Sequence, residues 1–306
     1  MTGGLLQVGY FGKLPSQSDF VRSASHYVLT ELLDQWLADV MQRLAANPRW
    51  RQHYDAMEPL RFAFLGTRSP LVVLGHLTAS RDQSQRRFPF VCTVQRGVPQ
   101  GEDFLACCPL ALAPAWAALE QAAASGKFAP LHSSCDLPAA GAAFRAFLQS
   151  ETVEGLGRLL GVEPAGRLVL SVGLLLEDAY GAGAPPTRCL ALPLPADPAR
   201  RHAVAAFWLA LAQPLLLRSD LELALFIIQS GGRHMLVLGM DGANPSALHA
   251  LIDPEAAAEV LLPYSELGWV EAALDTRPKA QRLDACLAQA GLGLSTALQL
   301  YRECFA

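Results

Sequence analysis

Residues 221–240 read LELALFIIQSGGRHMLVLGM, and this stretch decides which kind of sheet the chain can build. Two apolar runs flank Ser230-Gly231-Gly232, where glycine tolerates the positive φ angles that a tight turn requires. The pattern therefore predicts an antiparallel hairpin. A second hairpin is expected upstream, because LRFAFLG and LVVLGHLTA are separated only by Thr67-Arg68-Ser69-Pro70.

Further strands and helices are expected in groups on both sides of this hairpin. Strands are predicted at 5–11, in RFPFVCTV (87–94), in LVLSVGLLL (168–176) and in RCLALPLP (188–195), the last at a sheet edge because of its prolines. Helices are predicted at 29–44, as two or three pieces in 103–160 with a break near 125–136, at 199–217, and from 253 onward with breaks at Gly291 and Gly293; 181–186 is expected to be a loop. The sequence thus predicts an α+β (layered α/β) fold, a mainly antiparallel curved sheet flanked by helices.

The composition favours a globular chain with a sizeable core, since 52% of its residues are hydrophobic and only 17% are charged. A net charge of -4 argues against nucleic-acid binding, which needs clustered basic residues. Seven cysteines at irregular spacing are typical of reduced thiols. The start lacks a signal-peptide pattern, and the most apolar stretch, 105–119, is short and contains Pro109 and Pro114. We expect a soluble cytoplasmic protein without direct membrane insertion.

Catalytic and cofactor motifs are not recognised. Gly9 and Gly12 stand too close for a phosphate-binding loop, and Leu14 follows Lys13 where that loop needs Ser or Thr. No His-Glu-x-x-His or Cys-x-x-Cys pattern indicates a metal site. Cys135, near His132, is the best candidate for a nucleophile, but an ordinary loop cysteine is the favoured interpretation. The sequence predicts no enzyme, no catalytic residue, no metal and no cofactor.

Two segments resemble the signatures of the TagF family, also called ImpM, accessory proteins of bacterial type VI secretion. GYFGKLPSQSDFV (9–21) is similar to the pattern Gly-x-Phe-Gly-Lys-Leu-Pro-x-x-Gly-Asp-Phe, with Gln17 where arginine is frequent and Ser18 in place of glycine. SRDQSQRRFPF (80–90) resembles Ser-x-Asp-x-x-Gly-Arg-x-Phe-Pro, with Gln85 in place of glycine. The candidate site residues are Gly9, Phe11, Gly12, Lys13, Leu14, Pro15, Asp19 and Phe20 in the first segment, and Ser80, Asp82, Arg86, Arg87, Phe88 and Pro89 in the second.

The resemblance implies a longin-like or SNARE-like fold and a cytoplasmic regulator that restrains type VI secretion after translation. Its implied partner is a forkhead-associated (Fha) scaffold or another component of the secretion machine. An assembly component required for secretion is the alternative. We expect a TagF-like domain over 1–252, with its motifs in 1–100 and a helical middle at 103–160, followed by a helical extension at 253–306. The oligomeric state is left open.

The charges in the two segments suggest how they fit together. We expect them to lie side by side, with Asp19 accepting hydrogen bonds from Arg86 or Arg87. Lys13 is expected to be exposed and to contact a partner, unless the first segment is only a connector. The arginines at 81, 86 and 87 could read a phosphorylated partner, although pairing with Asp82 or Asp19 is the favoured interpretation.

Overall fold

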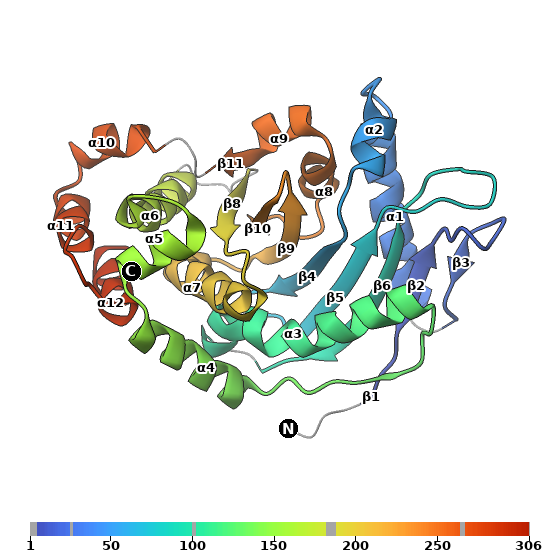
Figure 1. Ribbon diagram of the computed structural model, residues 1–306, viewed down its shortest axis with the longest axis horizontal. Helices are drawn as coiled ribbons and strands as arrows, with labels where there is room; N and C mark the ends of the chain where they lie inside the picture. Colours follow the sequence, from blue (N-terminus) through green and yellow to red (C-terminus); the bar gives the residue numbers. More distant parts are fainter. Residues whose placement is uncertain (1–4, 25–26, 100–101, 182–187, 264–266, 306) are drawn as a thin grey trace.

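The computed structural model describes residues 5–24, 27–99, 102–181, 188–263 and 267–305 (Figure 1). Its centre is an open sheet of nine strands in the order β11-β8-β10-β9-β4-β5-β6-β2-β3. Every neighbouring pair is antiparallel except β11 and β8. The strands span Gly9–Gly12 (β2), Val21–Arg22 (β3), Leu60–Gly66 (β4), Leu71–Thr78 (β5), Phe90–Gly97 (β6), Cys189–Leu194 (β8), Glu222–Ser230 (β9), Arg233–Gly239 (β10) and Leu261–Pro263 (β11).

The predicted α+β class with a mainly antiparallel sheet is confirmed. Both predicted hairpins are present, β4 with β5 and β9 with β10. The turn of the second hairpin is made by Gly231 and Gly232, whose φ angles of 56° and 76° need glycine. A separate two-stranded sheet pairs Leu5–Leu6 (β1) with Leu131–His132 (β7).

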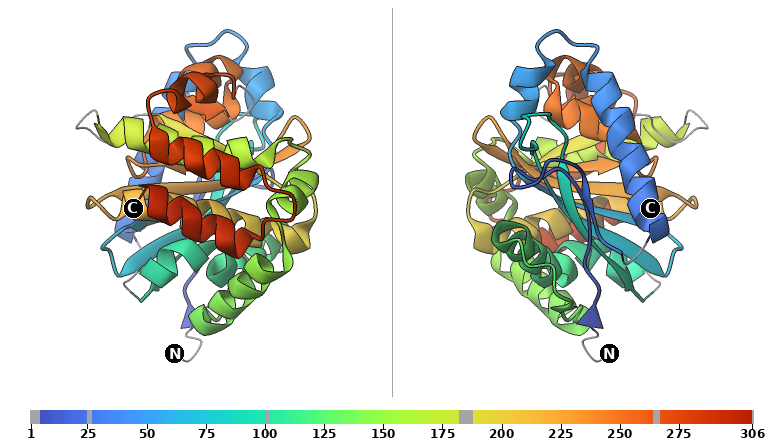
Figure 2. Two further views of the ribbon diagram at one scale, coloured as in Figure 1. Left: turned by 90° about the vertical axis from the view of Figure 1, so that its left-hand side faces the viewer. Right: turned by 90° about the vertical axis from the view of Figure 1, so that its right-hand side faces the viewer.

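Helices cover both faces of the sheet (Figures 1 and 2). Alternate side chains of one strand enter different cores: Phe62 packs in the cluster that contains α1, whereas Ala63 packs in the cluster that contains α3 and α7. The first group comprises α1 (Tyr27–Leu44), α2 (Trp50–Asp55), α8 (Pro245–Ile252) and α9 (Pro254–Val260). The second comprises α3 (Glu102–Ser125), α4 (Leu137–Ser150), α5 (Val153–Leu160), α6 (Ala165–Gly181), α7 (Pro198–Leu216), α10 (Trp269–Leu274), α11 (Pro278–Leu287) and α12 (Leu294–Phe305).

Two strand predictions are wrong. Residues 168–176 lie in helix α6 rather than in a strand, because this helix is buried on nearly all sides and carries no polar stripe that would reveal its period. β8 is not an edge strand, since β11 pairs with it in parallel. β11 pairs with β8 only as far as Ala191, and Pro193 lies beyond this pairing. The Pro193 carbonyl accepts a hydrogen bond from Trp208 Nε1, so β8 tolerates a proline at this position. Residues 182–186 of the predicted loop lie outside the described residues.

The apolar stretch at 105–119 continues as the 24-residue helix α3, which runs through Pro109 and Pro114. By length and composition, Asp103–Ser125 could cross a bilayer, but 61% of its most apolar window is buried inside the protein. The helix packs against α4, α7 and β5, as a core helix does. Residues of α10, α11 and α12 share the same hydrophobic cluster as α6 and α7. The domain boundary after residue 252 stays a prediction.

Candidate functional site

The two signature segments, 9–20 and 80–89, meet at one end of the sheet. The first forms β2 and the turn that leads to β3, and the second connects β5 to β6. β2 pairs with β6, with Gly12 opposite Phe90, and this pairing brings the segments together. The Gln83 amide donates a hydrogen bond of 3.0 Å to the Gln17 carbonyl. The expectation that the segments lie side by side is confirmed.

Gly12 is the point of closest approach between the segments. Its φ of 130° is rarely adopted by residues with side chains, and a Cβ atom there would lie 2.0 Å from the Pro89 carbonyl oxygen. Only glycine satisfies both conditions. The glycine thus serves the contact between two backbones.

Lys13 and Asp82 form a buried ion pair, in contrast to the expected exposure of Lys13. The Nζ atom lies 2.9 Å from Asp82 Oδ2, and the two side chains are 7% and 0% exposed. The same ammonium group lies 5.0 Å from the centre of the Phe20 ring. Lys13 turns inward because the second segment supplies a carboxylate that cannot reach water.

Asp82 accepts hydrogen bonds from both signature segments. Its carboxylate accepts hydrogen bonds from Lys13 Nζ, from the Arg86 amide at 2.9 Å and from Arg86 Nε at 2.7 Å. Burial by itself would raise the pKa of Asp82, but the bonds from Lys13 and Arg86 outweigh it and hold that pKa well below its usual range. The carboxylate therefore stays ionised and fixes both segments.

The predicted pairing of Asp19 is wrong. Arg86 Nε donates a hydrogen bond to Asp82, and Arg86 Nη2 donates one to the Ser18 carbonyl at 2.7 Å. Asp19 Oδ1 instead accepts a hydrogen bond from the adjacent Phe20 amide at 2.8 Å. Arg86 prefers Asp82 because that carboxylate is only four residues away and is fully buried.

The remaining arginines bind α2. Arg87 binds both oxygens of the Asp55 carboxylate, with Nε 2.8 Å from Oδ1 and Nη2 2.6 Å from Oδ2. Arg81 lies 3.7 Å from the same carboxylate. The hydrogen bonds from Arg87 lower the pKa of Asp55. Beside them, the buried Tyr54 hydroxyl bonds both the amide and the carbonyl of Ser80. Sequence reasoning missed Tyr54 and Asp55, and no motif pointed to them.

Three phenylalanines close the base of the site. The Phe11 and Phe20 rings stack with centres 5.5 Å apart, and Phe88 meets both rings edge-on. Phe11 and Phe88 are buried, whereas Phe20 remains 39% exposed. The matched aromatic residues therefore join the segments to the core and leave the Phe20 side chain partly exposed.

The outer parts of the segments are exposed and polar. Residues 15–19 and 83–86, here called the tips, stand above the buried Lys13–Asp82 pair. Gln85, where the TagF pattern has glycine, has a φ of 62° and is the one residue other than glycine with positive φ in the described part of the chain. Glycine at this position in the pattern therefore has a conformational reason.

Metal-ligand clusters and the candidate nucleophile Cys135 can be checked in the structure. In the described residues, no cluster of three or more His, Cys, Asp or Glu side chains could hold a metal ion. Burial raises the pKa of the Cys135 thiol, the opposite of what activation of a nucleophile requires. The site offers a rigid base with polar tips, an arrangement suited to binding another molecule.

Comparison with known proteins identifies part of the chain. Residues 9–134 match the family model of the TagF N-terminal domain, type VI secretion system-associated. This segment, which contains both signature segments, belongs to the TagF N-terminal domain family.

Among solved structures, the chain is similar to PA0076 from Pseudomonas aeruginosa PAO1, a crystal structure at 2.05 Å resolution. The two are 24% identical with a TM-score of 0.28, and the match covers 42% of this chain and 65% of that chain. The fold class given above rests on the sheet itself. None of the curated proteins compared with the chain matches it.

Proposed function

We propose that this chain is a non-catalytic cytoplasmic regulator that restrains type VI secretion after translation. It acts by protein–protein contact through the tips at 15–19 and 83–86. An Fha-type scaffold of the secretion machine is the proposed direct partner.

The observation that carries the proposal is the match of residues 9–134 to a domain associated with type VI secretion. The construction of the site supports a binding role. Lys13, Asp82 and Arg87 are occupied by one another or by α2, so their charges hold the loops rather than act on a substrate. The tips are exposed to a partner, and a rigid base reduces the ordering cost of that contact.

Deletion of the gene tests the direction of the effect. In a strain with an active type VI machine, deletion should raise the amount of effector in the culture supernatant while the cellular level of sheath protein stays constant. Unchanged secretion would contradict a restraining role. Abolished secretion would instead support the alternative, an assembly component required for the machine.

The partner is tested separately with purified proteins. The Fha-type scaffold from the same strain should bind the wild-type chain and should lose this binding when the tips carry Ser16→Arg and Ser84→Arg. Both serines are exposed, and neither side chain makes a hydrogen bond with the described residues. Ser295→Arg, at an exposed position on α12, is the matched control. Equal binding by all three proteins would exclude the tips as the contact.

A further inference from the structure

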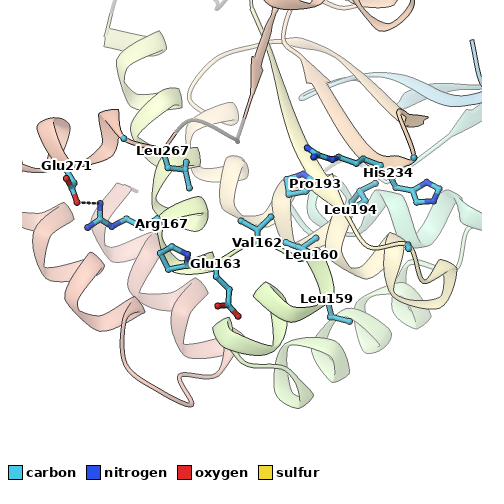
Figure 3. A pocket seen from close by; sticks show the side chains of 16 residues that line it. Leu159, Leu160, Val162, Glu163, Arg167, Pro193, Leu194, His234, Leu267 and Glu271 are labelled. Atoms are coloured by element: carbon cyan, nitrogen blue, oxygen red, sulfur yellow. Dashed lines mark hydrogen bonds and ion pairs between the residues drawn. The ribbon is translucent and has the colours of Figure 1, made fainter. Parts of the chain in front are cut away.

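A second candidate binding site lies far from the signature segments along the chain. It is a groove of about 880 Å³ between the α5–α6 turn, the end of β8, the β9–β10 turn and the start of α10. Figure 3 shows Leu160, Val162, Pro193, Leu194 and Leu267 around this space. The volume lies in the range of binding pockets in proteins. None of the lining residues belongs to the segment that matches the TagF N-terminal domain.

The charges around the groove are distributed unevenly. On one wall Arg167 pairs with Glu271 at 3.3 Å and with Asp284 at 3.2 Å, so its charge is compensated. The Glu163 carboxylate points away from Pro193 and Leu267 (Figure 3). Arg233, at the start of β10, also lines the groove, is exposed and has no ion pair among the described residues. An occupant with a carboxylate would therefore find a cation without a competing partner.

His234, the next residue of β10, also lines the groove (Figure 3). Burial, together with the nearby charges of Arg201 and Arg61, lowers the pKa of His234. The ring is therefore neutral at pH 7 and offers one hydrogen-bond donor and one acceptor. This side of the groove can bind polar groups without adding a second fixed charge.

Glycines leave open space along the groove. Gly161, Gly232 and Gly268 line it, and a Cβ atom added to any of them would meet no atom within 4 Å. The Gly161 amide already donates to the Gly157 carbonyl, so this glycine contributes space rather than a free donor. Open space beside apolar side chains and an exposed arginine suits an extended polypeptide that carries apolar and acidic side chains.

We propose that this groove binds an extended peptide segment of a partner protein, with apolar side chains against Val162, Pro193 and Leu267 and an acidic side chain on Arg233. The inference goes beyond the proposed function, since it uses none of the tip residues. Its success or failure is therefore independent of the role of the tips.

The test is a selection from a library of random peptides of about eight residues, which span roughly 27 Å when extended. The targets are the purified wild-type chain and three variants. Gly268→Trp fills the groove at a residue with an ordinary helical φ of -60°. Gly97→Trp, at the end of β6, is the control, because added atoms there also meet open space. Arg233→Glu inverts the charge.

Peptides that combine apolar residues with Asp or Glu should be enriched on the wild type and on Gly97→Trp. Labelled copies of the best peptide should bind Gly268→Trp about tenfold more weakly or worse, at an unchanged Tm. On Arg233→Glu the selected charge should change to Lys or Arg. No enrichment, equal binding to Gly268→Trp, or acidic peptides on Arg233→Glu would each overturn the proposal.

Discussion

The signature segments and the groove differ in how they use their polar groups. In the signature segments, Lys13, Asp82 and Arg87 are bound to other residues of the same protein. In the groove, Arg233 and three glycines face open space. The residues that match the TagF pattern thus mainly build a support. The departures from the pattern, Gln17, Ser18 and Gln85, all lie in the exposed tips. A signature can therefore identify a family through residues that hold the scaffold together.

Removal of one charged side chain should change the free energy of unfolding much more in the signature segments than in the groove. Lys13→Met leaves the Asp82 carboxylate buried without its ammonium partner and should lower the free energy of unfolding by about 3–5 kcal/mol. Arg233→Met removes an exposed charge without an ion pair among the described residues and should change it by less than about 0.5 kcal/mol. Chemical denaturation measures both. Similar values for the two variants would contradict the distinction.

Adding one methyl group gives a second matched comparison. Gly12→Ala places a Cβ atom against the Pro89 carbonyl at a strained φ, and should cost at least about 2 kcal/mol of stability. Gly268→Ala adds the same group in open space at a helical φ and should stay within about 0.5 kcal/mol. Thermal unfolding of both proteins provides the measurement. A stable Gly12→Ala protein would mean that the signature segments are not tightly packed.

Acid should weaken the signature segments through Asp82. Its pKa is lower in the folded than in the unfolded protein, where it is about 3.9. Its stabilising effect is therefore complete above about pH 5, shrinks as the pH falls through the unfolded pKa and is lost as the pH falls through the folded pKa. The Tm difference between the wild type and Asp82→Asn should therefore be constant from pH 7 to pH 5 and shrink below pH 4. A difference that persists unchanged at pH 2.5 would argue against the ionised pair.

The smallest expected effect is an increase in stability. Gln85 holds a left-handed backbone conformation with a φ of 62°, which glycine adopts without a steric cost. Gln85→Gly should stabilise the protein by about 0.5–1 kcal/mol, since the relief of strain exceeds the lost contact with Arg81 and the entropy of glycine. Denaturation at equilibrium can resolve this gain. A destabilised variant would show that the Arg81 contact outweighs the backbone strain.

The sheet could be predicted because its strands are short apolar runs bounded by turn residues, Thr67 to Pro70 in one hairpin and Ser230-Gly231-Gly232 in the other. Helix α6 was mistaken for a strand, since burial on nearly all sides removes the polar stripe. β11 was missed because three residues in a parallel edge pair carry no periodic signal.

The sequence predicted where the candidate site lies but not which residues form its ion pairs. The motifs located both segments, yet lysine is usually exposed, and the partner of Lys13 lies 69 residues away. Asp55, which binds Arg87, lies on a helix that no motif marked. The groove could not be foreseen, because four separate parts of the chain form it.

Effector secretion by a strain that carries Ser16→Arg and Ser84→Arg tests most directly whether the tips restrain type VI secretion. Both changes add bulk to exposed tip positions and should leave the Tm within the range of the Ser295→Arg control. Effector in the supernatant should rise to the level of the deletion strain, with unchanged sheath protein, while the control strain secretes like the wild type. Wild-type secretion by the strain with altered tips, at normal protein level and Tm, would contradict the proposed role of the tips.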